Sequence, residues 1–318
     1  MRRRAFLIGA GSFAAASIAQ ADAPFPAKDI TFIIPYSAGG GFDTYVRAIA
    51  PVMEKYLPQK VTIVPTNIPA GGGTRGTNEL YRAKPDGYTI AIFNIPGMFV
   101  LQERGGAGYD LAKITWLGSI GRDHYALGVG AKSPLKSMAD LKALAAKRPV
   151  KFTTTGPEAT AYAATLIASE LLGLNAQMIG GYKGSNEYVV AAIRGDGDAV
   201  VTALPLMRRM AAGGELRILA DFEPHTNIPG AADATDLGKP ELAEIVLERL
   251  IGAPPGLPEN IKAILSGALA KAVADPEVLT WAKKSDSELG WASPDEATAI
   301  LAEQGKFFQK WKKYLAPS

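Results

Sequence analysis

The chain has 318 residues, with 34 Lys and Arg against 31 Asp and Glu and no cysteine. The lack of cysteine excludes disulfides, thiol nucleophiles, cysteine-ligated zinc and iron–sulfur clusters, and also the cysteine that anchors an exported lipoprotein. His124 and His225 are the two histidines, so a site built from several histidines is excluded. We therefore expect neither a metal nor a cofactor.

Residues 1–23, MRRRAFLIGAGSFAAASIAQADA, read as an export signal. The apolar part is too short for a transmembrane helix. Arg3-Arg4 fits the twin-arginine pattern, although an ordinary signal with one more arginine remains the alternative. Ala19-Gln20-Ala21 predicts a signal of residues 1–21, cleaved to leave Asp22 first.

Removal of this signal changes the charge balance. Residues 1–21 hold three arginines and no acid, so the mature chain has 31 basic and 31 acidic residues. A neutral chain gives no reason to expect nucleic acid or an anionic membrane as a partner. We expect a periplasmic, soluble protein without a lipid anchor, and a monomer.

The first part of the mature chain alternates strand and helix patterns. Apolar runs predict strands at 30–34, 61–64 and 88–93, with helices at 43–57 and 77–83 between them. Pro51 predicts a kink or an early stop in the first helix. This order indicates a parallel sheet with helices on both faces.

Long strands between 114 and 130 are expected to pass from one lobe to another. A second set of strand and helix patterns follows, with strands at 151–155, 177–180, 199–204 and 216–220 and a capping box at Ser137–Asp140. The last 65 residues are predicted to be helical and to pack on the first lobe. The fold class is thus a two-lobed α/β protein, with lobe 1 at 22–123 plus 231–318 and lobe 2 at 124–230.

Four motifs occur in a fixed order: P-x-x-x-G-G-x-x-D-x-x-x-R, N-x-P-x-G-G, D-G-Y-T and Y-K-G. With these motifs, about residues 28–314 closely resemble the substrate-binding proteins of tripartite tricarboxylate transporters, the Bug family. The resemblance implies a type II periplasmic binding (venus-flytrap) fold and a receptor that carries a small organic anion, usually a carboxylate, to a two-part membrane permease.

The first glycine loop follows the strand at 30–34 and precedes a helix. Glycines let backbone N–H groups approach a ligand, and a helix N-terminus favours negative charge. A plain tight turn is the alternative. The resemblance implies that this loop holds a ligand carboxylate, through Ser37, Ala38, Gly39, Gly40 and Gly41, and Tyr36 at its start is a further candidate. Asp43 is a further candidate, although its place suits an N-cap, and Arg47 could pair with it one turn on.

The second glycine loop contains G-x-G-x-x-G at 71–76, the pattern of a dinucleotide site. That reading is poor, because the glycines do not directly follow a strand and no suitable acid follows. The resemblance instead makes Ala70, Gly71 and Gly72 the second half of a carboxylate clamp. Arg75 is either an ion-pair donor or a solvated charge.

The second lobe departs from the family pattern at 154–160. The family typically has a Ser or Thr pair with a nearby His there, to bind the other end of the ligand. This chain has TTGPEAT, which makes Thr155, Gly156, Glu158 and Thr160 candidates. Glu158 either faces the cleft and disfavours a second carboxylate, or only serves the first turn of its helix.

Other candidates are placed by the ends of predicted elements or by the family motifs. They are Phe93, Asn94, Tyr125, Tyr182, Lys183 and Thr202. Tyr side chains in a core or hinge are an equal alternative to ligand contacts.

We expect a binding receptor that performs no catalysis, with a small organic acid as ligand and permease subunits as partners. A receptor that feeds a sensor kinase, or an exported enzyme, is the alternative.

Overall fold

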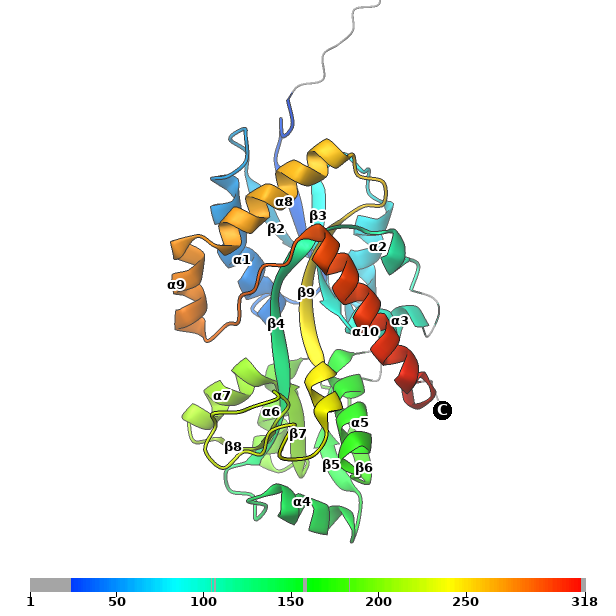
Figure 1. Cartoon of the computed structure of the whole chain (residues 1–318), viewed down its shortest axis with the longest axis vertical. Coiled ribbons are helices and arrows are strands. Elements are labelled where there is room, and N and C mark those ends of the chain that lie inside the picture. Colours follow the sequence, from blue (N-terminus) through cyan, green and yellow to red (C-terminus); the bar gives the residue numbers. More distant parts are fainter. Residues whose placement is uncertain (1–23, 104, 106, 157–158, 183, 316–318) are drawn as a thin grey trace, which may run out of the picture.

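The computed structural model describes residues 24–103, 105, 107–156, 159–182 and 184–315 (Figure 1). The predicted export signal and its cleavage site, and the candidates Glu158 and Lys183, lie outside the described residues. Among the residues that are described, no helix is both long and apolar enough to cross a membrane.

The described chain forms two lobes joined by long strands (Figure 1). Its strands are β1 Ile30–Ile34, β2 Ile63–Asn67, β3 Thr89–Ile95, β4 Thr115–Gly130, β5 Val150–Thr153, β6 Ala176–Ile179, β7 Ala199–Ala203, β8 Leu216–Asp221 and β9 Val246–Ala253. Its helices are α1 Gly41–Glu54, α2 Thr74–Arg82, α3 Gly97–Glu103, α4 Met138–Ala145, α5 Thr160–Leu172, α6 Ser185–Arg194, α7 Leu204–Ala212, α8 Glu259–Val273, α9 Pro276–Ser285 and α10 Pro294–Leu315. Short 3₁₀ turns lie at Gly71–Gly73, Leu111–Lys113 and Pro240–Glu244.

Lobe 1 is built on the predicted parallel unit. β1 pairs in parallel with β2 and β3, and β9 then pairs antiparallel with β3. β1 has the predicted bounds, because its continuous apolar run is buried on both faces of the sheet. The parallel order brings the ends of β1 and β2, each followed by a glycine turn, to one edge of the sheet.

Lobe 2 repeats the arrangement around β4. β4 pairs antiparallel with β7 and β8, and β5 lies in parallel between β7 and β6. β4 is one strand that also pairs with β9 in lobe 1, with irregular register along the way. One strand therefore carries the sheet from lobe to lobe.

The C-terminal helices cover lobe 1, and the last one also reaches lobe 2. α8 and α9 pack on α1, whereas α10 contacts β4, α3 and α5 (Figure 1). Phe307 and Phe308 on α10 are buried in the core cluster of lobe 2, together with Phe152 and Phe222. α10 thus spans both lobes.

The contacts around the lobe boundaries bear on where the lobes divide. Ala234, Leu242 and Ile245 belong to the core cluster of lobe 2, so residues 231–245 pack with lobe 2 although lobe 1 was expected to resume at 231. The bounds of the lobes stay a prediction, and these contacts favour a division near 246.

Three elements escaped the sequence patterns: β9, α3 and α7. In β9, all eight residues are buried, including Glu248 and Arg249. A charged pair interrupts the apolar run, so the periodicity of a buried strand is lost. The strand forms because both charges have partners on β4. Glu248 pairs with Arg122, and Arg249 pairs with Asp123.

The packing of α10 generates a stability prediction. Phe307→Ala should lower the free energy of unfolding by about 3–5 kcal/mol, since it removes a buried ring and leaves a cavity. Leu279→Ala on α9, where the side chain is 50% exposed, should change it by less than about 0.5 kcal/mol. Urea unfolding measures both. Equal effects would mean that α10 does not hold lobe 2.

Candidate functional site

The first glycine turn leads directly into α1. The helix begins at Gly41, and Gly40 is its N-cap, with extended backbone and no side-chain cap. This corrects the expectation that Asp43 caps the helix, because Asp43 is already its third residue. The first amides of α1 thus lack a side-chain acceptor at the cap position.

Asp43 instead ties the first glycine turn to the end of β2. It is 3% exposed, and its carboxylate accepts hydrogen bonds of 2.9 Å each from Gly39 N, Arg47 Nε and Asn67 Nδ2. Asn67 ends β2 and also donates to Tyr36 O at 3.0 Å. The expected pairing of Arg47 with Asp43 is confirmed. Although burial by itself would raise the pKa of Asp43, the bonds from Arg47, Gly39 and Asn67 hold this pKa below its usual value.

The second glycine turn lies against the first. Gly72 and Gly73 have positive φ angles of 64° and 103°, which glycine adopts without strain. A Cβ added to Gly73 would lie 3.0 Å from Tyr36 Oη. The Tyr36 ring also stacks on Phe42 at 4.6 Å between ring centres, so Tyr36 lies between the second turn and the start of α1.

Asn94 and Thr160 meet where the lobes touch. Thr160 Oγ1, at the start of α5 in lobe 2, donates to Asn94 Oδ1 on β3 of lobe 1 at 3.0 Å. Phe93 faces elsewhere: it is fully buried in the core of lobe 1, edge-to-face with Trp116 at 4.9 Å. This packing gives Phe93 a role in the core rather than at a ligand.

The remaining candidates of lobe 2 have different surroundings. Thr202 is 1% exposed, and its hydroxyl hydrogen-bonds Tyr188 Oη at 2.8 Å. Tyr182 Oη donates to Asp196 at 3.2 Å. Thr155 and Gly156 lie between β5 and α5, and the buried hydroxyl of Thr155 has no hydrogen-bond partner among the described residues.

Sequence reasoning missed the charged residues where β4 and β9 cross between the lobes. Asp123 and Arg249 form an ion pair whose side chains are 3% and 5% exposed. Arg249 also lies over the Tyr45 ring, with Cζ 4.1 Å from the ring centre. The charges inside two otherwise largely apolar stretches, ITWLGSIGRDHYALGVG and VLERLIGA, were the available signal, since buried charges require partners.

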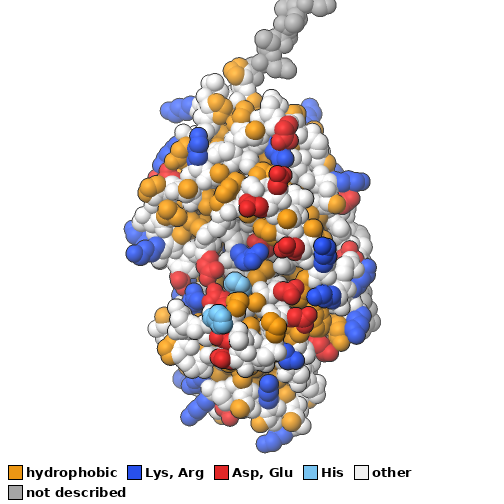
Figure 2. Space-filling view, in the orientation of Figure 1, with side chains coloured by type: hydrophobic (Ala, Val, Ile, Leu, Met, Phe, Trp, Pro, Cys, Tyr) orange, Lys and Arg blue, Asp and Glu red, His pale blue; other side chains and the backbone are white. Residues whose placement is uncertain are grey.

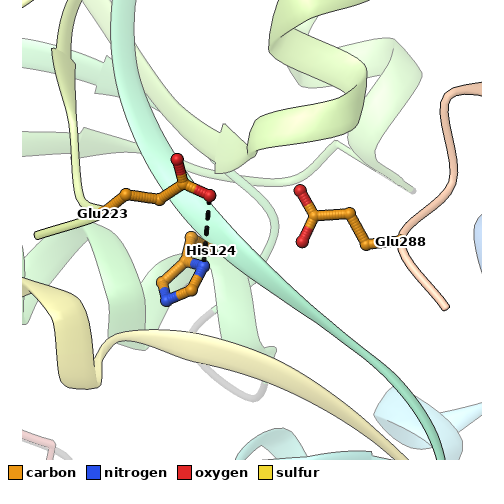
Figure 3. Close-up of side chains that lie close together, drawn as sticks. All are labelled: His124, Glu223 and Glu288. Atoms are coloured by element: carbon orange, nitrogen blue, oxygen red, sulfur yellow. Dashed lines mark ion pairs between the residues drawn. The ribbon is translucent and has the colours of Figure 1, made fainter. Parts of the chain in front are cut away.

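A second charged group links the lobes at their shared face, where acidic, basic and histidine side chains gather (Figure 2). His124 Nδ1 lies 3.6 Å from Glu223 Oε1, and Glu288 points toward the same place from the segment before α10 (Figure 3). Arg208 on α7 lies 3.6 Å from Glu223 and 3.7 Å from Glu288.

The ligand atoms of His124, Glu223 and Glu288 lie within 4.8 Å of one another, a spacing that could hold a metal ion. Arg208 already supplies a cation between the two carboxylates, so these residues are better explained as an ion-pair network. Burial, with added repulsion from Asp123 and Glu223, raises the pKa of Glu288 to about 7.

Comparison with known proteins places this geometry among periplasmic receptors. Residues 45–314 match the family described as "Tripartite tricarboxylate transporter family receptor". The chain is 28% identical to "UPF0065 protein in gbd 5'region" of Cupriavidus necator, covering 96% of this chain and 95% of the relative. It is 26% identical to BugT of Bordetella pertussis, covering 90% of this chain and 88% of the relative.

Solved structures agree with these sequence matches. A protein described as a periplasmic transporter superposes with a TM-score of 0.79 at 26% identity, covering 91% of this chain and 97% of that one. An R. palustris protein solved with adipate has a TM-score of 0.78 at 23% identity, covering 92% and 98%. The second likeness shows the fold alone.

The Asp43 network generates a prediction about stability and acid. Asp43→Asn should lower the free energy of unfolding at pH 7 by about 1–3 kcal/mol, because a charged acceptor of three hydrogen bonds is lost. The native pKa lies below the unfolded one, so this stability is present above about pH 4 and lost as pH falls further. Urea unfolding at pH 3 and 7 measures it, with exposed Asp295→Asn as the control. A deficit of the same size at both pH values would contradict the charge-based explanation.

Glu288 should respond to pH with the opposite sign. Its native pKa of about 7 exceeds the ordinary 4.5, so the native state binds the proton more tightly and stability is lost as pH rises between these values. Between pH 5 and 7.5 the wild type should lose about 1–2 kcal/mol relative to Glu288→Gln, after allowance for solvent screening of a side chain 35% exposed. Thermal unfolding across this range tests it, and exposed Glu303→Gln should follow the wild type. Parallel curves for Glu288→Gln and wild type would refute the raised pKa.

Proposed function

Because this chain belongs to the tripartite tricarboxylate transporter receptor family, we propose that it captures a small organic carboxylate between its lobes and delivers it to membrane permease subunits. The proposal includes export to the periplasm and action as a monomer. The matched family is one of receptors, and the chain is accordingly a solute-binding receptor and not an enzyme.

One observation supports carboxylate binding above the others: two glycine turns lie together, the first tied by Asp43 and Asn67 to the end of β2 and the second against Tyr36. Asp43 accepts from Gly39 N in the first turn, and Asn67 bonds both Asp43 and Tyr36 O. Glycines let a ligand approach the backbone of both turns closely, and the start of α1 adds the positive end of a helix dipole. Two such turns side by side form a clamp that favours an anion.

Contacts between the lobes support capture by closure. Thr160 of lobe 2 donates to Asn94 of lobe 1, and Phe42, next to the first turn, packs against the core clusters of both lobes. A ligand on the clamp therefore lies beside lobe 2 when the lobes are together. Enclosure removes water and strengthens the hydrogen bonds to its carboxylate.

Binding is tested with a panel of organic acids and their uncharged amides. A carboxylate at a hundred times its dissociation constant should stabilise the protein by about 2.7 kcal/mol, which a thermal shift assay detects. The matching amide should not, because the clamp selects for negative charge. Calorimetry then gives the affinity, which Asp43→Asn should weaken about tenfold by loosening the first turn.

The result against the proposal is equally concrete. If no monocarboxylate or dicarboxylate stabilises the wild type, or if amides bind as well as acids, carboxylate capture is wrong. Transport assays with the permease subunits added would test delivery separately from binding.

A further inference from the structure

Arg249 lies beside the first glycine turn, at the crossing of β4 and β9. A Cβ added to Gly41 would be 4.0 Å from Arg249 Nη2. The rings of Phe42 and Tyr45, both on α1, lie 5.5 Å and 4.1 Å from Arg249 Cζ. The guanidinium is thus held under the helix whose N-terminus forms half of the clamp.

Most of the hydrogen-bonding capacity of this guanidinium is unused. Arg249 Nη2 donates to Asp123 Oδ2, but Nε and Nη1 are buried without a hydrogen-bond partner in the described part of the chain. Asp123 Oδ1 is buried and unpartnered there as well. Two donors and one acceptor therefore lie unpaired on a single ion pair.

Such a pair is costly if it serves only to hold the fold. Buried polar groups in folded proteins are nearly always hydrogen-bonded, and an ion pair compensates for its desolvation only when its other polar atoms are also satisfied. The neighbouring pair of Arg122 and Glu248 provides a contrast, since Arg122 is 47% exposed and solvates its remaining donors in water. The unpaired atoms of Arg249 and Asp123 are buried away from water. Polar groups of a bound ligand could supply their missing hydrogen bonds.

The surrounding groups define what that ligand would present. The Tyr36 hydroxyl is also buried in this region, and its ring stacks on Phe42. Burial raises the pKa of Tyr36 and of Tyr125, so both remain neutral. The charges of Arg249 and Asp123 cancel, and the pair offers hydrogen-bond donors beside an acceptor. It therefore matches a ligand group that has a hydrogen-bond acceptor next to a hydrogen-bond donor.

We propose that Arg249 and Asp123 recognise the ligand. Nε and Nη1 of Arg249 donate hydrogen bonds to a ligand oxygen. Oδ1 of Asp123 accepts a hydrogen bond from a hydroxyl or ammonium group on the neighbouring carbon. The ligand class is a 2-hydroxy or 2-amino carboxylate. This inference rests on the proposed carboxylate receptor function and assigns its selectivity to two residues outside the glycine turns.

The test compares matched acids on matched variants. The acids are two series that differ only at the second carbon: succinate, malate and aspartate, and propionate, lactate and alanine. The variant Asp123→Asn/Arg249→Gln removes both charges together, so no unpaired buried charge remains. The control Arg122→Gln/Glu248→Gln neutralises the adjacent pair on the same two strands.

Calorimetry should show that the wild type and the control prefer a substituted acid over the unsubstituted one by about tenfold or more, as expected for one charge-assisted hydrogen bond. The double variant should reduce this ratio to within about twofold. The hydroxy and amino members then show which donor is used. An equal affinity for all members of a series, or a ratio that survives in the double variant, overturns the inference.

A second readout covers an acid outside these series. The Nε–H resonance of Arg249, identified by its loss in the double variant, should shift when any bound carboxylate from the wider panel is added. If an acid binds and this resonance does not move, the role of Arg249 is wrong while the receptor function stands. If no carboxylate binds at all, the proposed function fails and the inference fails with it.

Discussion

The pairing of β4 with β9 is the constraint on which the rest of the molecule depends. β4 takes part in the sheets of both lobes, and β9 lies beside it where it crosses. Four charges occur at this crossing, and they are tolerated because Arg122 pairs with Glu248 and Arg249 with Asp123. The two pairs lie on opposite faces of the strands. The pair of Arg122 and Glu248 reaches solvent, and the pair of Arg249 and Asp123 lies against α1. The strand register thus decides which pair is buried beside α1.

Local sequence patterns predicted many of the strands and helices. The elements that they missed depend on contacts between residues distant in the sequence. The run ITFII predicted β1 at its observed bounds, since four apolar residues among five fit a strand buried on both faces. β9 was missed because its burial depends on charges more than a hundred residues away. Asp43 was placed at the right end of α1 and its pairing with Arg47 was predicted, but its Asn67 partner lies 24 residues on, beyond the reach of capping rules.

The candidate site divides into a part that the sequence could predict and a part that it could not. The glycine turns are visible as motifs, and backbone N–H groups within them suit any carboxylate. The side chains that could tell one acid from another come from β3, β4, β9 and α5, and only the folded chain brings them together. Asn94 and Thr160 were predicted separately and meet in the structure. Asp123 and Arg249 needed the strand pairing to be known.

The path of α10 bears on how the lobes can move. Its start packs beside lobe 1, Phe307 and Phe308 are inserted in the core of lobe 2, and near its end Lys312 binds Glu103 of α3 while Tyr314 binds Glu170 of α5. A rotation that separates the lobes must bend α10 or withdraw two aromatic rings from a packed core. Withdrawal exposes apolar surface to water, which is unfavourable by about 25 cal/mol per Å². The α10 helix therefore resists separation of the lobes, which favours small opening angles. Exchange of solute then depends on the bending of this one helix.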